Sequence, residues 1–329
     1  MDRIGRKSRK PSVEWPTVVL IVFCYGTWAA AGLWVWPSLP VVALLLMAFA
    51  VALQSSLIHE VLHGHPTRNA LANEALVFFP LGLAWPYRRY KTLHLRHHAD
   101  ERLTDPFDDP ESYYQALWRH EAMPGWLRLL LRVNNTMVGR FVIGPWLSVI
   151  GFVAGDARQM LAGDRAIRQA WMLHVAGVLP VLAVVAWGFG IPLWLYVLVP
   201  AWLGQSMIAI RTFAEHQWSD APEGRTVIVE KTPLSFLFLN NNLHFVHHAR
   251  PTAAWYELPR LFRERRDEWV RANNGYVFPN YLAMLKAWAF RPKEPVVHPV
   301  LRATPECGGA AAWQAKRQAD QAQAVQPAE

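Results

Sequence analysis

Histidine is the residue type in this chain whose spacing most clearly indicates chemistry. Eight of the thirteen histidines fall in three short clusters: His59-Glu-Val-Leu-His63, His94-Leu-Arg-His97-His98 and His244-Phe-Val-His247-His248. Side chains three and four residues apart share one face of a helix, so each cluster presents two or three imidazoles to one side. Neutral imidazole is the commonest protein ligand for metals. Shared between two ions, the eight imidazoles give about four ligands each, and the pattern predicts a two-metal site.

Other interpretations of these clusters explain less of the sequence. A single His-x-x-x-His pair is common on ordinary helices, but a purely structural role would leave many imidazoles charged or desolvated against one another. Taken alone, the first cluster also matches the His-Glu-x-x-His signature of zinc metalloproteases, in which the glutamate is the general base. That interpretation leaves the second and third clusters unexplained. Imidazole suits zinc, copper, iron and nickel alike, so spacing alone does not select the metal.

Apolar segments long enough to cross a bilayer must position these clusters. The chain is 53% hydrophobic and only 18% charged, against about 25% charged in soluble domains. Its mean hydropathy is +0.08, which predicts a membrane protein with much of its length outside the bilayer. Four stretches qualify or nearly so, at residues 17–36, 41–58, 171–187 and 193–210. Short uncharged links join them in pairs, so we expect an all-α membrane protein with four transmembrane helices in two hairpins.

The distribution of charge predicts the orientation of these spans. Basic residues crowd the segment 1–16, the middle segment and the segment after Ile210, whereas both hairpin links are neutral. The positive-inside rule therefore places both termini and all three clusters on the cytoplasmic side, in a helical cap that holds the two-metal site. The net charge of +8 then reports orientation rather than nucleic-acid binding. We expect an integral protein of a bacterial inner membrane, with a retained first span rather than a cleaved signal peptide.

The remaining segments complete the predicted organisation. Ala75–Pro86 and Phe141–Gly155 are too short to cross comfortably and are predicted to be interfacial or partly re-entrant helices; a soluble core helix is equally open for the second. The stretch Glu257–Tyr276 predicts an amphipathic helix on the membrane surface. We divide the chain into a cytoplasmic N-terminus (1–16), an integral domain (17–300) and a disordered tail (301–329).

The three clusters, in this order and on one side of four spans, resemble the three histidine boxes of the membrane fatty acid desaturase superfamily. Trp255 and Leu258-Pro259, after the third cluster, fit the same resemblance, which covers roughly residues 41–261. It implies a non-haem centre of two irons that activates dioxygen and oxidises an unactivated C–H bond of a long-chain lipid. Fatty acyl desaturation is the expected reaction. Acyl or alkane hydroxylases and carotenoid hydroxylases or ketolases use the same boxes and remain alternatives, and Glu60 stands where many desaturases have aspartate.

The resemblance also implies roles for residues around the boxes. Family members often carry a further ligand between the fourth span and the third box, and His216 lies there. Glu60 and Glu215 are expected to accept hydrogen bonds that orient imidazoles. We expect at least two of Asn240, Asn241 and Asn242 to begin a helix, with hydrogen bonding to a metal-ligating imidazole as the alternative. The acids of the Asp105–Asp109 segment are expected to form a turn, with contact to substrate or a box histidine as the alternative.

The other histidines receive separate predictions. His120 and His298 are expected at the surface. His174 is expected to be a satisfied interfacial residue, with approach to the metal centre as the alternative. The role of His65 stays open.

Composition predicts that the electron donor is separate. The chain has two cysteines, Cys24 and Cys307, and shows no fused cytochrome b5 signature. A separate electron-transfer protein of the ferredoxin, rubredoxin or cytochrome type, together with its reductase, is therefore the expected partner. The substrate is expected to enter from the bilayer.

Overall fold

The computed structural model of the protein describes residues 13–99 and 102–301. The described part is mostly helical, as predicted. Nearly all of the predicted disordered tail and most of the basic N-terminus lie outside the described residues.

Five helical segments of the described chain are long and apolar enough to cross a membrane, at residues 15–35, 40–62, 137–161, 165–188 and 193–215. Four of them overlap the four predicted spans. In order they are α1 (Trp15–Ala30) with η1 (Ala31–Val35), α2 (Pro40–Leu62), α8 (Arg165–Ala183) with η2 (Val184–Gly188), and α9 (Leu193–Tyr196), η3 (Val197–Ala201) and α10 (Trp202–Glu215). The segments η1, η2 and η3 are single wide turns of π-helix.

The fifth apolar helix corrects a sequence prediction. The sequence predicts that Phe141–Gly155 is too short to cross and is interrupted by Pro145. Instead, α7 runs over Met137–Leu161, through Pro145 and past the flanking charged residues Arg140 and Asp156. Both charged side chains are buried and bonded inside the protein. The Arg140 Nε donates to the Asn134 carbonyl at 3.1 Å, and Asp156 pairs with Arg89. Because these charges are satisfied, the helix continues beyond them.

The helix α2 lies at the centre of the apolar bundle. It packs against α1 on one side and α10 on the other, and residues from Ala48 to Leu62 are almost all buried. Gly204 of α10 allows close approach, because a Cβ atom there would lie 2.5 Å from the Val51 Cγ1 atom. Cys24 of α1 donates to the Ala50 carbonyl at 3.2 Å. The first histidine cluster lies at the C-terminal end of this central helix.

The apolar stretch Ala75–Pro86 is not the helix that was predicted. The helix α3 (Ala70–Leu76) ends at its start, and the remainder is an irregular loop packed among the membrane helices. Leu81 N donates to the Gln54 side chain at 2.7 Å, and the Tyr196 hydroxyl donates to the Leu81 carbonyl at 2.9 Å. Side chains of α2 and α9 therefore satisfy backbone groups that lipid could not.

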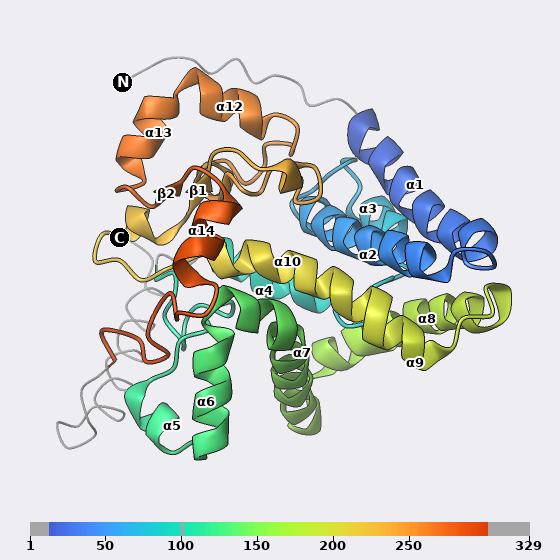
Figure 1. The fold of residues 1–329 in the computed structure, drawn as a ribbon, viewed down its shortest axis with the longest axis horizontal. Helices are drawn as coiled ribbons and strands as arrows, with labels where there is room; N and C mark the ends of the chain where they lie inside the picture. The colour runs from blue at the N-terminus through green and yellow to red at the C-terminus, as the bar shows by residue number, and fades with distance from the viewer. Residues whose placement is uncertain (1–12, 100–101, 302–329) are drawn as a thin grey trace, which may run out of the picture.

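A cap of short elements gathers at one end of the bundle (Figure 1). Its helices are α4 (Tyr87–Ala99), α5 (Leu117–Glu121), α6 (Gly125–Asn134), α11 (His244–Ala249), α12 (Leu258–Glu264), α13 (Arg266–Ala272) and α14 (Tyr281–Trp288), with 3-10 turns η4 (Pro222–Arg225) and η5 (Pro233–Ser235). Two short parallel strands, β1 (Ile228–Val229) and β2 (Val277–Phe278), pair Ile228 with Val277. The single amphipathic helix predicted over Glu257–Tyr276 is in fact the pair α12 and α13.

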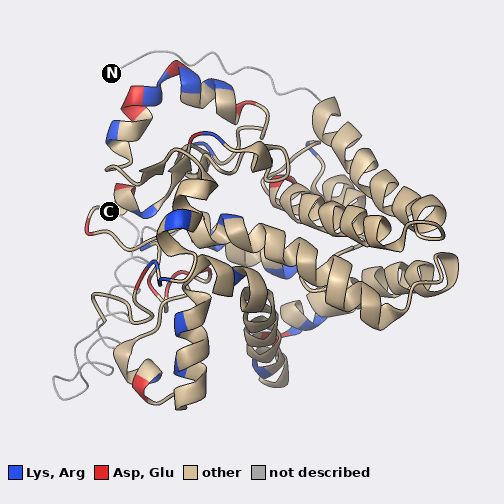
Figure 2. Ribbon diagram, viewed as in Figure 1, with Lys and Arg blue, Asp and Glu red and all other residues tan. Residues whose placement is uncertain are grey.

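Charged residues follow the same division. Figure 2 shows Lys, Arg, Asp and Glu over the cap and along α4, whereas the hairpin ends of α1, α2, α8 and α9 carry none. This distribution is the one expected of helices whose far ends lie in lipid.

Candidate metal centre

The structure brings all nine predicted metal ligands together in two groups. The five-histidine group contains His59, His63, His94, His98 and His247, and the four-histidine group contains His97, His216, His244 and His248. Within each group one nitrogen of every imidazole lies within 4.8 Å of the others. The sequence identified these nine histidines as a set, and the structure shows how they divide into two groups.

Two short helices divide their histidines between the groups. On α4, His94 and His98 are one turn apart and belong to the five-histidine group, whereas His97 belongs to the other. On α11, His244 and His248 are one turn apart in the four-histidine group, and His247 points to the five-histidine group. Both helices therefore contribute histidines to both groups. Residues i and i+4 lie on one side of the helix, and residue i+3 is turned toward the other group.

Within the groups, the Nε2 atoms lie at distances that suit a shared ion. In the five-histidine group they are 3.2 Å for His63–His94, 3.0 Å for His94–His98 and 3.1 Å for His98–His247. In the four-histidine group they are 3.0 Å for His97–His216 and 3.0 Å for His216–His244. A metal about 2.1 Å from each nitrogen separates its ligands by about 3.0 Å at a right angle and about 3.4 Å at a tetrahedral angle.

The opposite ring nitrogens are held by acceptors. His94 Nδ1 lies 2.6 Å from a Glu111 carboxylate oxygen, and His97 Nδ1 lies 2.7 Å from Asp109 Oδ1. His216 Nδ1 lies 3.2 Å from the Arg225 carbonyl, and His244 Nδ1 lies 3.0 Å from Asn241 Oδ1. A proton on Nδ1 that is donated to such an acceptor leaves the Nε2 lone pair to face the centre of the group, as metal ligation requires.

Buried, incompletely paired nitrogens also fit bound metal. The Nε2 atoms of His59 and His248 are buried and find no hydrogen-bond partner among the described residues. Burial and the neighbouring His94 lower the pKa of His63 to about 3, and burial and His97 lower the pKa of His216 to about 3. These imidazoles are neutral at pH 7, which is the ligating form.

His97 differs from the other imidazoles because carboxylates face it. Burial lowers its pKa, but the neighbouring carboxylates of Glu111 and Asp109 outweigh burial and raise the pKa of His97 to about 9. Burial alone would raise the pKa of Asp109, but the hydrogen bond and the charge of His97 lower it.

Both outcomes predicted for the acids after the second box occur together. The Asp105–Asp109 segment does turn, but Asp109 also binds His97, and its other oxygen accepts from Thr104 N at 2.8 Å. Glu111 was not singled out from the sequence. The position of two acids soon after a histidine box was the available signal, because ligating histidines commonly donate to carboxylates.

Glu215 lies near His244 but accepts its closest hydrogen bonds from other side chains. Its Oε1 atom is 2.8 Å from Arg211 Nε, 3.0 Å from Asn241 Nδ2 and 3.6 Å from His244 Nδ1. The expectation that Asn240–Asn242 begin a helix is wrong, because α11 has Leu243 at its N-cap. Asn241 instead links Glu215 to His244 through its side-chain amide.

Glu60 contacts a different histidine from those predicted to be ligands. It accepts from Trp255 N at 3.0 Å and lies 3.7 Å from His65 Nε2. On the other side of the ring, His65 Nδ1 lies 2.7 Å from Glu14. His65 thus lies between two carboxylates, and the buried cluster of Glu14, His65 and Glu60 links the start of α1 to the end of α2.

The three remaining predicted histidines lie outside both groups. The surface prediction for His298 is wrong, because its side chain is buried with ring centroids 4.5 Å from Trp218 and 5.2 Å from Tyr114. His174 lies 2.9 Å from the Leu83 carbonyl, so it is satisfied as expected. His120 lies half-buried on α5.

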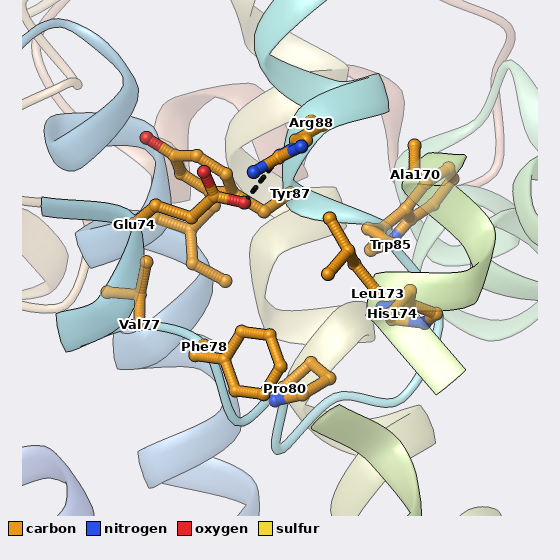
Figure 3. A pocket seen from close by; sticks show the side chains of 11 residues that line it. Glu74, Val77, Phe78, Pro80, Trp85, Tyr87, Arg88, Ala170, Leu173 and His174 are labelled. Atoms are coloured by element: carbon orange, nitrogen blue, oxygen red, sulfur yellow. Dashed lines mark hydrogen bonds and ion pairs between the residues drawn. The ribbon is translucent and has the colours of Figure 1, made fainter. Parts of the chain in front are cut away.

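A small cavity of about 20 Å³ lies between α2, α3, α4 and α8 (Figure 3). Its walls include Ile58, next to His59, together with Phe78 and Leu173. The ion pair between Arg88 and Glu74, at 2.7 Å, lies at one side of it. The cavity therefore adjoins the first box on the apolar side of the cap.

Comparison with known proteins agrees with this geometry. The family model described as fatty acid desaturase matches residues 34–280, which is well over half of the chain and includes all nine grouped histidines. A search of curated proteins found no match. The resemblance inferred from the three boxes is confirmed, and the chain belongs to the fatty acid desaturase family.

Proposed function

We propose that the protein is a dioxygen-dependent membrane oxidoreductase that uses two irons to oxidise a long-chain lipid, with fatty acyl desaturation as its reaction. Family membership supports an oxidoreductase acting on lipid. The observation that carries the finer proposal is the division of nine buried or half-buried histidines into groups of five and four. A single zinc ion would use at most one of these groups.

The donor set fits the two irons that the family implies. The five-histidine group would hold one iron and the four-histidine group the other. Imidazole ligands suit iron but also zinc and copper, so the family, rather than the geometry, supports iron. When bound, the iron pair supplies the power to oxidise an unactivated C–H bond with dioxygen.

The protein's own residues orient and shield this centre. Asp109, Glu111 and Asn241 face the Nδ1 atoms of His97, His94 and His244, which directs each Nε2 atom into its group. His97, which carries a second proton in the absence of metal, would release it when metal binds. His97 and His244 are 0% and 2% exposed, and burial of this degree excludes bulk water from a reactive site.

The substrate follows from the surroundings of the centre. The first box ends an apolar helix, and the cavity beside Ile58 is walled mainly by apolar side chains. The cavity has room for about one water molecule, so the apolar surroundings of the first box, rather than a preformed channel, support an acyl chain from the bilayer as the substrate. A hydroxylase or ketolase would use the same centre, so the product distinguishes these reactions.

The zinc protease alternative receives no support from the first box. His63 packs with His94, His98 and His247 rather than alone with His59. Glu60, which would be the general base, is engaged by Trp255 N and lies beside His65.

We place the centre and both termini on the cytoplasmic side of a bacterial inner membrane, with four helices crossing and α7 lying along the surface. Near its start, α7 holds Arg140 4.9 Å from the Tyr113 ring, and near its end Asp156 forms a two-pronged ion pair with Arg89 of α4. Both ends of α7 thus contact the cap side, which a crossing helix would not do. In Figure 1, α7 runs steeply across the direction of α10.

Electrons must come from another protein, because the family centre has no reductant of its own. A ferredoxin, rubredoxin or cytochrome with its reductase is the proposed partner.

Lipid profiling of cells that express the protein tests the reaction. Wild-type protein is expected to introduce a new double bond into fatty acyl chains. His97→Ala and His247→Ala should abolish the product, whereas His120→Ala, outside both groups, should retain it. A hydroxylated product without any new double bond would refute desaturation.

A further inference from the structure

His216 is the one grouped histidine that lies outside the three boxes, and its backbone leaves the helix that precedes it. It follows the last residue of α10, with extended dihedral angles of φ −130° and ψ 150°. Even so, its Nε2 atom lies 3.0 Å from those of both His97 and His244. Something other than helical geometry must hold this residue in place.

The end of α10 is capped by groups from three distant segments. A helix leaves its last four carbonyls without internal partners. Here the Ala214 carbonyl accepts from the Tyr276 hydroxyl at 2.5 Å, and the Glu215 carbonyl accepts from Val227 N at 3.0 Å. The Phe213 and His216 carbonyls both accept from Lys293 Nζ, at 2.8 and 2.7 Å.

The Lys293 side chain donates three hydrogen bonds at the end of α10. Its third bond, at 2.8 Å, goes to the Tyr276 hydroxyl, which completes the three donors of an ammonium group. Burial lowers the pKa of the Lys293 amine well below its usual range, whereas the C-terminal end of a helix favours the charged form. Tyr113 adds a further anchor, because its hydroxyl donates to the His216 carbonyl at 2.9 Å.

The chain around Lys293 forms a strap, residues 289–301, that is itself fastened to the cap. Lys293 N donates to the Asn135 carbonyl at 2.8 Å, and Gln115 N donates to the Val296 carbonyl at 2.8 Å. His298 N donates in turn to the Gln115 carbonyl at 2.9 Å. The strap lies beyond residue 280, where the match to the family model ends.

We propose that Lys293 is a positioning residue, which holds the His216 imidazole in the four-histidine group by fixing the backbone at the end of α10. The strap delivers this lysine from outside the family-matched region. The inference rests on the proposed two-metal centre, and it predicts that loss of Lys293 weakens metal binding in the four-histidine group selectively.

Cobalt titration of the full-length protein, purified in detergent and freed of metal, tests the proposal without requiring activity. The visible absorption of cobalt follows each binding step, and His63→Ala and His216→Ala assign the steps to the five- and four-histidine groups. Lys293→Met should leave the first group unchanged and weaken the second by about 10- to 100-fold, the usual effect of losing a group that supports a ligand. Lys286→Met, on the exposed face of α14, is the matched control and should bind as wild type.

A double variant separates positioning from general damage. If Lys293 acts through His216, adding Lys293→Met to His216→Ala should change cobalt binding no further. Equal weakening of both groups, or wild-type binding by Lys293→Met, would overturn the inference. Failure of the wild-type protein to take up two cobalt ions would instead reject the centre itself.

If Lys293→Met does not fold, Tyr113→Phe decides the question. This change removes only the hydroxyl that donates to the His216 carbonyl. A smaller but equally selective weakening of the four-histidine group is expected, and unchanged cobalt binding would overturn the proposal.

Discussion

At the scale of single residues, the centre is built from pairs of an imidazole and its acceptor. Spacing along the chain predicted the imidazoles, because i, i+3 and i+4 repeats are visible in the sequence. Their acceptors come from turns and loops, such as Asp109 twelve residues after His97 and Arg225 nine residues after His216. No periodicity marks these partners, so only the fold reveals which acid belongs to which histidine.

Asp109→Ala is expected to impair the four-histidine group. His97 would lose the acceptor that fixes its Nδ1 proton, and metal affinity there should fall about 10- to 100-fold. The measurement is cobalt titration of metal-free protein. Asp105→Ala is the control on the same turn, because Asp105 accepts from Phe107 N. Equal effects from the two variants would contradict the assigned role of Asp109.

At the scale of elements, the main correction concerns α7. Its apolar stretch is flanked by Arg140 and Asp156, and the helix continues past both because they are buried in bonds to the cap. Exposed Val142, Trp146 and Ile150 recur every four residues along this helix. They form an apolar stripe that suits the surface of a bilayer. Sequence reasoning cannot foresee such burial, because Arg89 lies 67 residues from Asp156.

Cysteine labelling in intact membrane vesicles tests the proposed placement of α7. Cysteines introduced singly at Arg158 near its end and at Arg132 just before its start should react with a charged reagent from the same, cytoplasmic, side. Both positions are exposed. A cysteine at Ser38, in the first hairpin link, should react from the opposite side. Reaction of the Arg132 and Arg158 positions from opposite sides would show that α7 crosses the membrane.

The ion pair that fastens α7 to α4 should be important for stability. Asp156 is 2% exposed, and it accepts from Arg89 and from the Trp171 indole at 2.8 Å. Asp156→Ala would leave Arg89 without its buried partner, a change that costs about 3–5 kcal/mol. Thermal unfolding in detergent should show a lower midpoint, whereas Asp267→Ala on the exposed side of α13 should show little change. Equal midpoints for both variants would contradict this role.

At the scale of the whole molecule, composition and spacing predicted the general organisation but not its assembly. Apolar stretches identified four of the five long helices, and the boxes identified the family. The irregular loop at Leu81 and the strap at Lys293 could not be predicted, because each depends on contacts between distant segments. His298 looked like a surface residue among prolines, yet the strap buries it against Trp218.

The central claim is that nine histidines hold two irons, and metal analysis of the purified protein tests it most directly. Two groups of ligands predict close to two irons per chain, with iron lowered in His97→Ala and His247→Ala but retained in His120→Ala. Activity should require dioxygen. Zinc near one per chain, with activity that persists in the absence of oxygen, would contradict the account.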